Sequence, residues 1–204
     1  MIKLPQFLPR AKRYDSSSSK PEFRGDKPLR LRWNEEDLSI LLPIYAAIGR
    51  ANRAAAVNNR LPAVGENGFL PPGIHKSTWL EFVVRFGWNH RRRWLLQGLG
   101  RQLRMLRHAG CHHVFVGGSL ISTKPRPTDF DGCFDISHID RRKLWELEPR
   151  LWNTSGAQSL QRQDGGVLYP SLYLPALQST TIEFLQFDSR SGEHKGIVVV
   201  QEDH

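Results

Sequence analysis

The hydrophobic periodicity of the chain changes near residue 110, and this change limits the folds that it can form. Between Asn89 and Ala109 leucines recur at helical spacing, at Leu95, Leu99, Leu103 and Leu106. Beyond Gly110 the apolar runs become short and alternate with polar residues, which is typical of strands. Helices followed by short strands predict an α/β (α+β) fold with a small mixed sheet, flanking helices and a helical N-terminal extension.

The same patterns predict where the elements lie. We expect strands at His113–Val116, Asp129–Asp135, Thr181–Phe187 and Gly196–Gln201. One helix is expected to begin at Lys76 or Ser77 and to end at Gly87, a longer one to run from the Asn89 cap to Ala109, and a third to span Arg141–Leu147. The first three strands should share one sheet, with the long helix packed on it through its leucines.

The N-terminal residues differ in composition from the rest of the chain. Residues 1–33 contain the serine run Ser16–Ser19 among lysines, arginines and prolines, so we expect a flexible basic tail. Residues 35–58 have helical character after a capping Asn34, and a loop rich in Gly and Pro follows. We therefore expect a tail at 1–33, a helical extension and loop at 34–68, and the main domain at 69–204.

The charge balance points to an anionic partner. The chain has 29 Lys and Arg against 20 Asp and Glu, a net charge of +9. This charge suits nucleic acid or another polyanion, although it also fits a basic protein that is merely soluble. No apolar stretch is long enough to cross a bilayer, so no membrane partner is expected. Two unpaired cysteines and no apolar leader segment predict a cytoplasmic location.

Glycines and aspartates gather at the ends of two neighbouring predicted strands. The first strand ends in Gly117, Gly118 and Ser119, and the second opens with Asp129 and Asp131. Strand alternation places both aspartates on one face, where they repel each other unless a cation lies between them. Oxygen ligands of this kind suit Mg²⁺, and side-chain-free backbone at the glycines lets N–H groups approach a phosphate. The alternative is an ordinary turn, because Asp favours such positions.

A third carboxylate is expected on another strand. Glu183 is the single acid within Thr181–Phe187, between Ile182 and Phe184. A charge in the middle of a core-type strand is costly unless a metal or a partner meets it. We expect Glu183 to complete the site and to accept a proton from an incoming hydroxyl, unless it simply faces solvent from an edge strand.

This arrangement resembles the signature of a known superfamily. Gly118-Ser119, nine intervening residues and Asp129-Phe130-Asp131 are similar to the motif of the DNA polymerase β-like nucleotidyltransferases. The small members, called minimal nucleotidyltransferases, occur in bacterial toxin–antitoxin and phage-defence modules. The chain over roughly residues 69–200 also resembles an uncharacterised bacterial family assigned to that fold. The resemblance identifies residues 69–204 as a nucleotidyltransferase-like domain.

The resemblance implies a role for each site residue. Asp129 and Asp131 would bind two Mg²⁺ ions, and Glu183 would be the third catalytic carboxylate. The triphosphate of a nucleoside triphosphate substrate would contact the loop between the motif halves and the turn before it, at Gly117, Gly118, Ser119 and Lys124. The implied reaction transfers a nucleoside monophosphate to a hydroxyl and releases pyrophosphate.

Three functions follow from these observations. The first is a Mg²⁺-dependent nucleotidyltransferase whose acceptor is RNA or a partner toxin or antitoxin protein. The second is a catalytically inactive nucleotidyltransferase-like binding module that acts as an antitoxin or as a nucleic-acid-binding subunit. The third is a basic RNA-binding protein with structural acids, in which replacing Asp129 and Asp131 by Asn would leave RNA binding unchanged.

Overall fold

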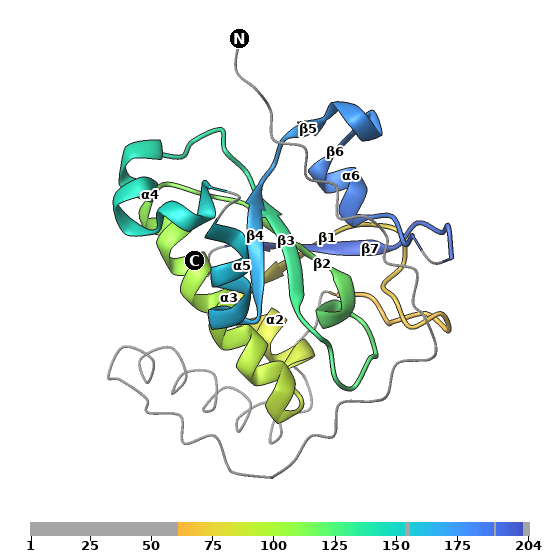
Figure 1. The fold of residues 1–204 in the computed structure, drawn as a ribbon. Coiled ribbons are helices and arrows are strands. Elements are labelled where there is room, and N and C mark those ends of the chain that lie inside the picture. The colour runs from red at the N-terminus through yellow and green to blue at the C-terminus, as the bar shows by residue number, and fades with distance from the viewer. Residues whose placement is uncertain (1–60, 154–155, 190, 202–204) are drawn as a thin grey trace, which may run out of the picture. The chain divides into compact units, whose positions relative to one another are not determined.

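The computed structural model describes residues 61–153, 156–189 and 191–201, and its centre is a five-stranded sheet (Figure 1). The strand order across the sheet is β1 (Gly73–Thr78), β7 (Gly196–Gln201), β2 (Val114–Gly117), β3 (Phe130–Phe134) and β4 (Gly166–Pro170). The strands β2 and β3 are antiparallel, as are β2 and β7, whereas the pairs β1–β7 and β3–β4 are parallel. A mixed sheet with flanking helices confirms the predicted fold class. The predictions for residues 1–60 lie outside the described residues.

Two helices precede β2 and supply much of the core. Helix α2 (Trp79–Phe86) begins with a capping box in which Thr78 and Glu81 bond each other's backbone N–H groups. Helix α3 (His90–His108) follows Asn89, whose side chain accepts a hydrogen bond from the Arg92 N–H. Both helices confirm the periodicity of the sequence, but the first begins at Trp79 rather than at Lys76 or Ser77, because these two residues belong to β1. The predicted leucine stripe of α3 is buried in the core with Val114, Val116, Phe130 and Phe134 of the sheet.

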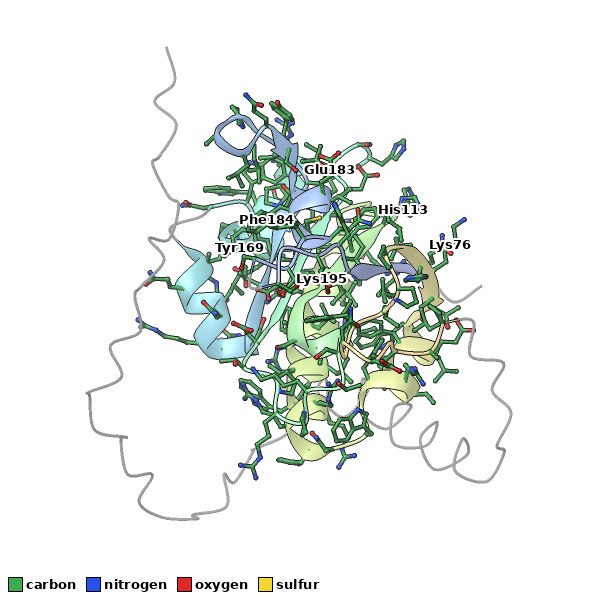
Figure 2. All side chains as sticks on the ribbon, turned by 90° about the vertical axis from the view of Figure 1, so that its right-hand side faces the viewer. Lys76, His113, Tyr169, Glu183, Phe184 and Lys195 are labelled. Carbon is green, nitrogen blue, oxygen red and sulfur yellow. The ribbon has the colours of Figure 1, made fainter. Side chains whose placement is uncertain are left out.

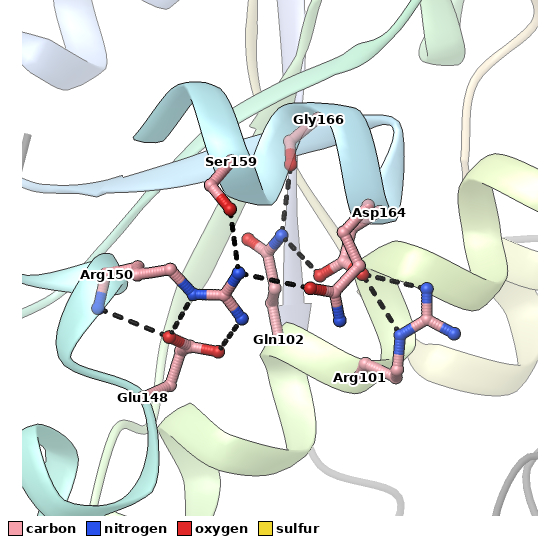
Figure 3. A network of polar contacts seen from close by, with 8 residues as sticks. Arg101, Gln102, Glu148, Arg150, Ser159, Asp164 and Gly166 are labelled. Atoms are coloured by element: carbon pink, nitrogen blue, oxygen red, sulfur yellow. Dashed lines mark hydrogen bonds and ion pairs between the residues drawn. The ribbon is translucent and has the colours of Figure 1, made fainter. Parts of the chain in front are cut away.

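A buried polar network fixes α3 to α5 (Ala157–Asp164) and to β4 (Figure 3). The Arg101 guanidinium donates to Oδ1 of Asp164 at 2.8 and 3.1 Å, and the Gln102 amide donates to Oδ2 at 3.0 Å. The same amide donates to the Gly166 carbonyl, and its oxygen accepts from the Leu168 N–H. Because Gln102 and Asp164 are almost fully buried, these bonds form without competition from water.

The remaining elements are short. Helix α4 (Arg141–Leu147) has the predicted bounds and follows Asp140, which caps it. Strands β5 (Tyr173–Leu174) and β6 (Ser179–Thr180) form a small hairpin that leads into α6 (Thr181–Leu185). The 3-10 turns span Gly118–Ile121, Pro149–Leu151 and Pro175–Leu177. Figure 1 shows α3 and α6 on opposite sides of the sheet.

The predicted strand Thr181–Phe187 is wrong, because its first five residues form α6. Thr180 accepts a hydrogen bond from the Glu183 N–H, and the Glu183 carboxylate accepts one from the Thr180 N–H. This capping box starts a helix despite the β-branched run that favours a strand. The sequence analysis also missed strands β1 and β4 of the main sheet, the hairpin strands β5 and β6, and helix α5.

No helix in the described part of the chain is both long and apolar enough to span a membrane.

The network at Gln102 makes a testable contribution to stability. Replacing Gln102 by Leu would leave the Gly166 carbonyl and the Leu168 N–H without their buried partner, so we expect a loss of about 2–4 kcal/mol. Urea unfolding measures this loss. The matched control is Gln158→Leu on the exposed side of α5, where we expect a change within about 0.5 kcal/mol. An unchanged urea midpoint for Gln102→Leu would show that the network adds no stability.

Candidate functional site

The two halves of the Gly-Ser and Asp-x-Asp motif lie side by side. Strand β2 ends at Gly117, which pairs directly with Asp131 of β3 in the antiparallel ladder. The chain then turns through Gly118 and Ser119, and the Ser119 hydroxyl donates to the carbonyl of Asp129 at 3.5 Å. The structure therefore brings the glycine turn and both aspartates together, as the sequence predicts.

The Asp131 carboxylate lies directly against the backbone of Gly118. A Cβ atom at Gly118 would be 2.5 Å from Oδ2 of Asp131, so a larger residue would force the carboxylate to move. Gly118 also has a φ of +71°, in the left-handed region that favours glycine. Both features favour glycine at this position, and the first shows that the turn lies next to a carboxylate.

The surroundings of Asp131 disfavour its charge. Burial and, after it, the nearby Asp129 raise the pKa of Asp131 to about 6, while the positive charge of Lys195 opposes the shift. The residue is nevertheless exposed at its surface, so water reaches the carboxylate even though protein atoms crowd around it. A bound cation would relieve both the lost hydration and the repulsion between the two acids.

Asp129, the other carboxylate of the pair, is half-buried. The Gln161 amide of α5 donates to its Oδ2 at 3.3 Å. Within the described residues, neither Asp129 nor Asp131 forms an ion pair closer than 4 Å. Gly117 is buried next to Leu185, whereas Gly118 is half-buried. Two carboxylates beside this glycine turn fit Mg²⁺, which usually takes one or two carboxylates together with substrate phosphates.

Glu183 does not join the pair, which corrects the sequence-based expectation. Its carboxylate accepts hydrogen bonds from the Thr180 N–H at 2.7 Å, the Thr180 hydroxyl at 2.9 Å and the Ser179 hydroxyl at 3.2 Å. These bonds, the backbone one first, lower the pKa of the exposed carboxyl. Among the described residues no three His, Cys, Asp or Glu side chains are placed to hold one metal ion. The three acids therefore do not converge as predicted.

Two residues near the aspartate pair, Lys195 and Tyr169, could not be assigned to the site from the sequence around them. Lys195, just before β7, lies 3.6 Å from Oδ1 of Asp188 and acts on the charge of Asp131 (Figure 2). Tyr169 of β4 pairs in register with Cys133, which places it on the same face as Asp131. Burial, then Asp131 and Asp129, raise the pKa of Tyr169. Both residues depend on strand pairing across the sheet, which a local pattern does not reveal.

Lys124 occupies the exposed loop between the motif halves. Its ammonium donates to the Thr128 hydroxyl at 3.5 Å, and its backbone N–H donates to the Ser122 hydroxyl. The interactions described for its side chain remain within the loop, so its proposed phosphate contact stays a prediction.

The raised pKa of Asp131 predicts a pH-dependent effect on stability. A carboxyl that binds its proton more tightly in the folded state adds stability below about pH 4, and this stability is lost as the pH rises through 6. Asp131→Asn should therefore melt at a higher temperature than the unmodified protein at pH 8 without metal, and at a similar temperature near pH 4. Thermal unfolding in a chelator tests this expectation.

Asp135 provides the matched control on the same strand face. Burial acts to raise its pKa, but hydrogen bonds from Ser137 and His113 outweigh this effect and lower it. Asp135→Asn should therefore melt lower at pH 8, the opposite sign. A lower melting temperature for Asp131→Asn at pH 8 would contradict the repulsion that we infer at the pair.

Comparison with known proteins identifies the family but gives no function. No curated protein and no solved structure matches the chain. A family model matches residues 62–201, which include the sheet, α3 and both halves of the motif. The chain therefore belongs to a family of unknown function, DUF6932.

Proposed function

We propose that this chain is a Mg²⁺-dependent nucleotidyltransferase that moves a nucleoside monophosphate from a nucleoside triphosphate to a hydroxyl. The observation that carries the proposal is the Asp131 carboxylate packed against the Gly118 turn, with Asp129 beside it. A triphosphate needs a turn that can bind phosphate, and Mg²⁺ needs carboxylates that are not already engaged in ion pairs. The described residues provide both at the same place.

Each residue has a separate part in the proposed reaction. The Gly118–Ser119 part of the turn presents backbone and a hydroxyl to the triphosphate, whereas Gly117 is buried against Leu185 of α6. Asp129 and Asp131 hold Mg²⁺, which neutralises charge on the phosphates when it is bound. Lys195 adds a positive charge near Asp131. The acceptor oxygen bonds to the α-phosphorus as the bond to the pyrophosphate breaks, and the proton of the acceptor hydroxyl passes to solvent water.

The acceptor is proposed to be RNA or a partner toxin or antitoxin protein in the cytoplasm. Buried free thiols at Cys111 and Cys133 are compatible with a reducing compartment. The basic charge is unevenly distributed, because residues 1–60 contain 12 Lys and Arg against six Asp and Glu. RNA contacts, if the acceptor is RNA, would draw on this N-terminal charge.

A binding module without turnover is the second candidate, and Glu183 is the observation that favours it. The carboxylate expected to take the proton from the acceptor caps α6 instead. Such a module would bind Mg²⁺ and a nucleoside triphosphate at the same turn and would use the complex to recognise its partner.

Transfer of label tests the proposed activity directly. The full-length protein is incubated with Mg²⁺, each α-labelled nucleoside triphosphate, total RNA and the candidate partner protein. Asp129→Asn and Asp131→Asn should lower transfer by about 100-fold or more, because each removes a charge from the cation site. Asp135→Asn is the control and should retain transfer.

Measuring the binding of labelled nucleotide and of RNA to the same variants separates the rival functions. Nucleotide binding that depends on both aspartates, without transfer to RNA or protein, would favour the binding module. RNA binding that persists unchanged in both Asn variants, without nucleotide binding, would favour the basic RNA-binding protein.

The capping role of Glu183 gives a further prediction. Glu183→Gln keeps an oxygen that can accept from the Thr180 N–H, so the protein should retain both its fold and any nucleotide transfer. Glu183→Ala should lower the free energy of unfolding by about 1 kcal/mol through loss of the cap. Transfer lost in Glu183→Gln at unchanged stability would restore the catalytic role predicted from the sequence.

A further inference from the structure

The N-terminal turn of α3 binds the loop that joins the two halves of the motif. The Asn89 amide donates to the Pro125 carbonyl at 2.7 Å. The Arg91 Nε donates to the Pro127 carbonyl at 3.0 Å, and its Nη2 donates to the carbonyl of Thr128. Thr128 immediately precedes Asp129. The Arg91 side chain of α3 therefore holds the backbone immediately before Asp129, the first of the two proposed metal ligands.

Arg92 holds the other end of the same loop. Its guanidinium is fully buried and donates to the carbonyls of Leu120 at 2.6 Å, Ser122 at 2.5 Å and Lys124 at 2.8 Å. The guanidinium carbon also lies 4.7 Å from the centre of the Trp88 ring. Burial lowers the pKa of Arg92 to about 10, and no described carboxylate acts on it. The backbone of the loop is thus the main partner of a buried charge.

These contacts determine the shape of a segment that has little regular structure of its own. Between the turn at Gly118–Ile121 and β3, the described backbone forms no helix and no strand. Its carbonyl groups instead accept hydrogen bonds from Asn89, Arg91 and Arg92. Because the segment starts beside Ser119 and ends at Asp129, its shape sets how the glycine turn and that aspartate face each other.

We propose that Arg91 and Arg92 are positioning residues of the nucleotide site, which fix the 120–128 loop so that the Gly118–Ser119 turn and Asp129 meet one triphosphate. The inference rests on the proposed function. Neither arginine needs to touch the nucleotide, since both act through backbone carbonyls. Lysine cannot replace arginine in this role, because one ammonium does not reach two carbonyls in the fixed geometry of the guanidinium fork.

Arg91 is the residue to test, because it is only half-buried and its replacement spares the core. Arg91→Gln removes the two hydrogen bonds and the charge, and Arg91→Lys removes the fork but retains the charge near Asp129. Arg150→Gln is the matched control, since Arg150 forms a bidentate pair with Glu148 and donates to Ser159 and Gln163, and none of these partners belongs to the 120–128 loop (Figure 3). Arg92→Lys is the second variant for the opposite end of the loop.

Binding of inorganic tripolyphosphate with Mg²⁺ to the full-length protein is the measurement, because this probe needs no choice of base. We expect calorimetry to show binding weakened on the order of tenfold in both Arg91 variants, because a small misplacement of a site is enough. The control should bind as the unmodified protein does, even if it melts lower. Amide hydrogen exchange at residues 119–129 should be faster in the Arg91 variants and unchanged in Arg150→Gln.

Each result decides the proposal. Weakened binding shared by Arg91→Gln and Arg91→Lys, with faster exchange in the loop, supports positioning. Normal binding in Arg91→Lys with a loss in Arg91→Gln would overturn it and assign the effect to charge. Unchanged binding in both variants would overturn the positioning role alone. If the unmodified protein does not bind tripolyphosphate with Mg²⁺, the proposed function fails and the inference fails with it.

Discussion

The packing of α5 against α3 leaves no room for a side chain at Gly98. A Cβ atom there would lie 1.9 Å from the Asp164 carbonyl oxygen, so only glycine allows this approach. The approach places the Asp164 carboxylate against Arg101 and Gln102, and the Gln102 amide in turn reaches the backbone of β4. Helix α3 thus has two attachments. Residues in the middle of the helix fix the edge strand of the sheet, and residues in and next to its first turn fix the 120–128 loop. The placement of Asp129 and Asp131 depends on both attachments.

The predictable parts of the fold and the site are those whose determinants are close in sequence. The leucine stripe, the Asn89 cap, the alternation in β2 and β3 and the short apolar run of β7 are local patterns, and the structure confirms the elements that they predict. The Gly118 turn and the aspartates could also be placed together from sequence. They lie at the facing ends of two strands joined by one short loop, and an antiparallel pair brings such ends together.

The parts that could not be predicted depend on contacts between distant residues or on competition between local signals. The capping box at Thr180 and Glu183 outweighs a β-branched run, so a predicted strand becomes α6 and its acid leaves the site. Strand β4 is a short apolar segment that becomes recognisable only through its pairing with β3. The carbonyls that Arg91 and Arg92 bind in the loop lie 28 to 37 residues further along the chain. A run of three arginines does not indicate such partners.

The contrast between two kinds of carboxylate in this fold supports a binding role for the aspartate pair. Glu148 has a bidentate partner in Arg150, whose hydrogen bond lowers the pKa of Glu148, as expected of a structural ion pair. Asp131 has the opposite shift, although Arg91 and Lys195 are near the pair. Arg91 donates to backbone carbonyls and Lys195 pairs with Asp188, so these cations leave the aspartate oxygens available. A fold that keeps two like charges together while directing nearby cations elsewhere leaves a site whose electrostatics the proposed Mg²⁺ would complete.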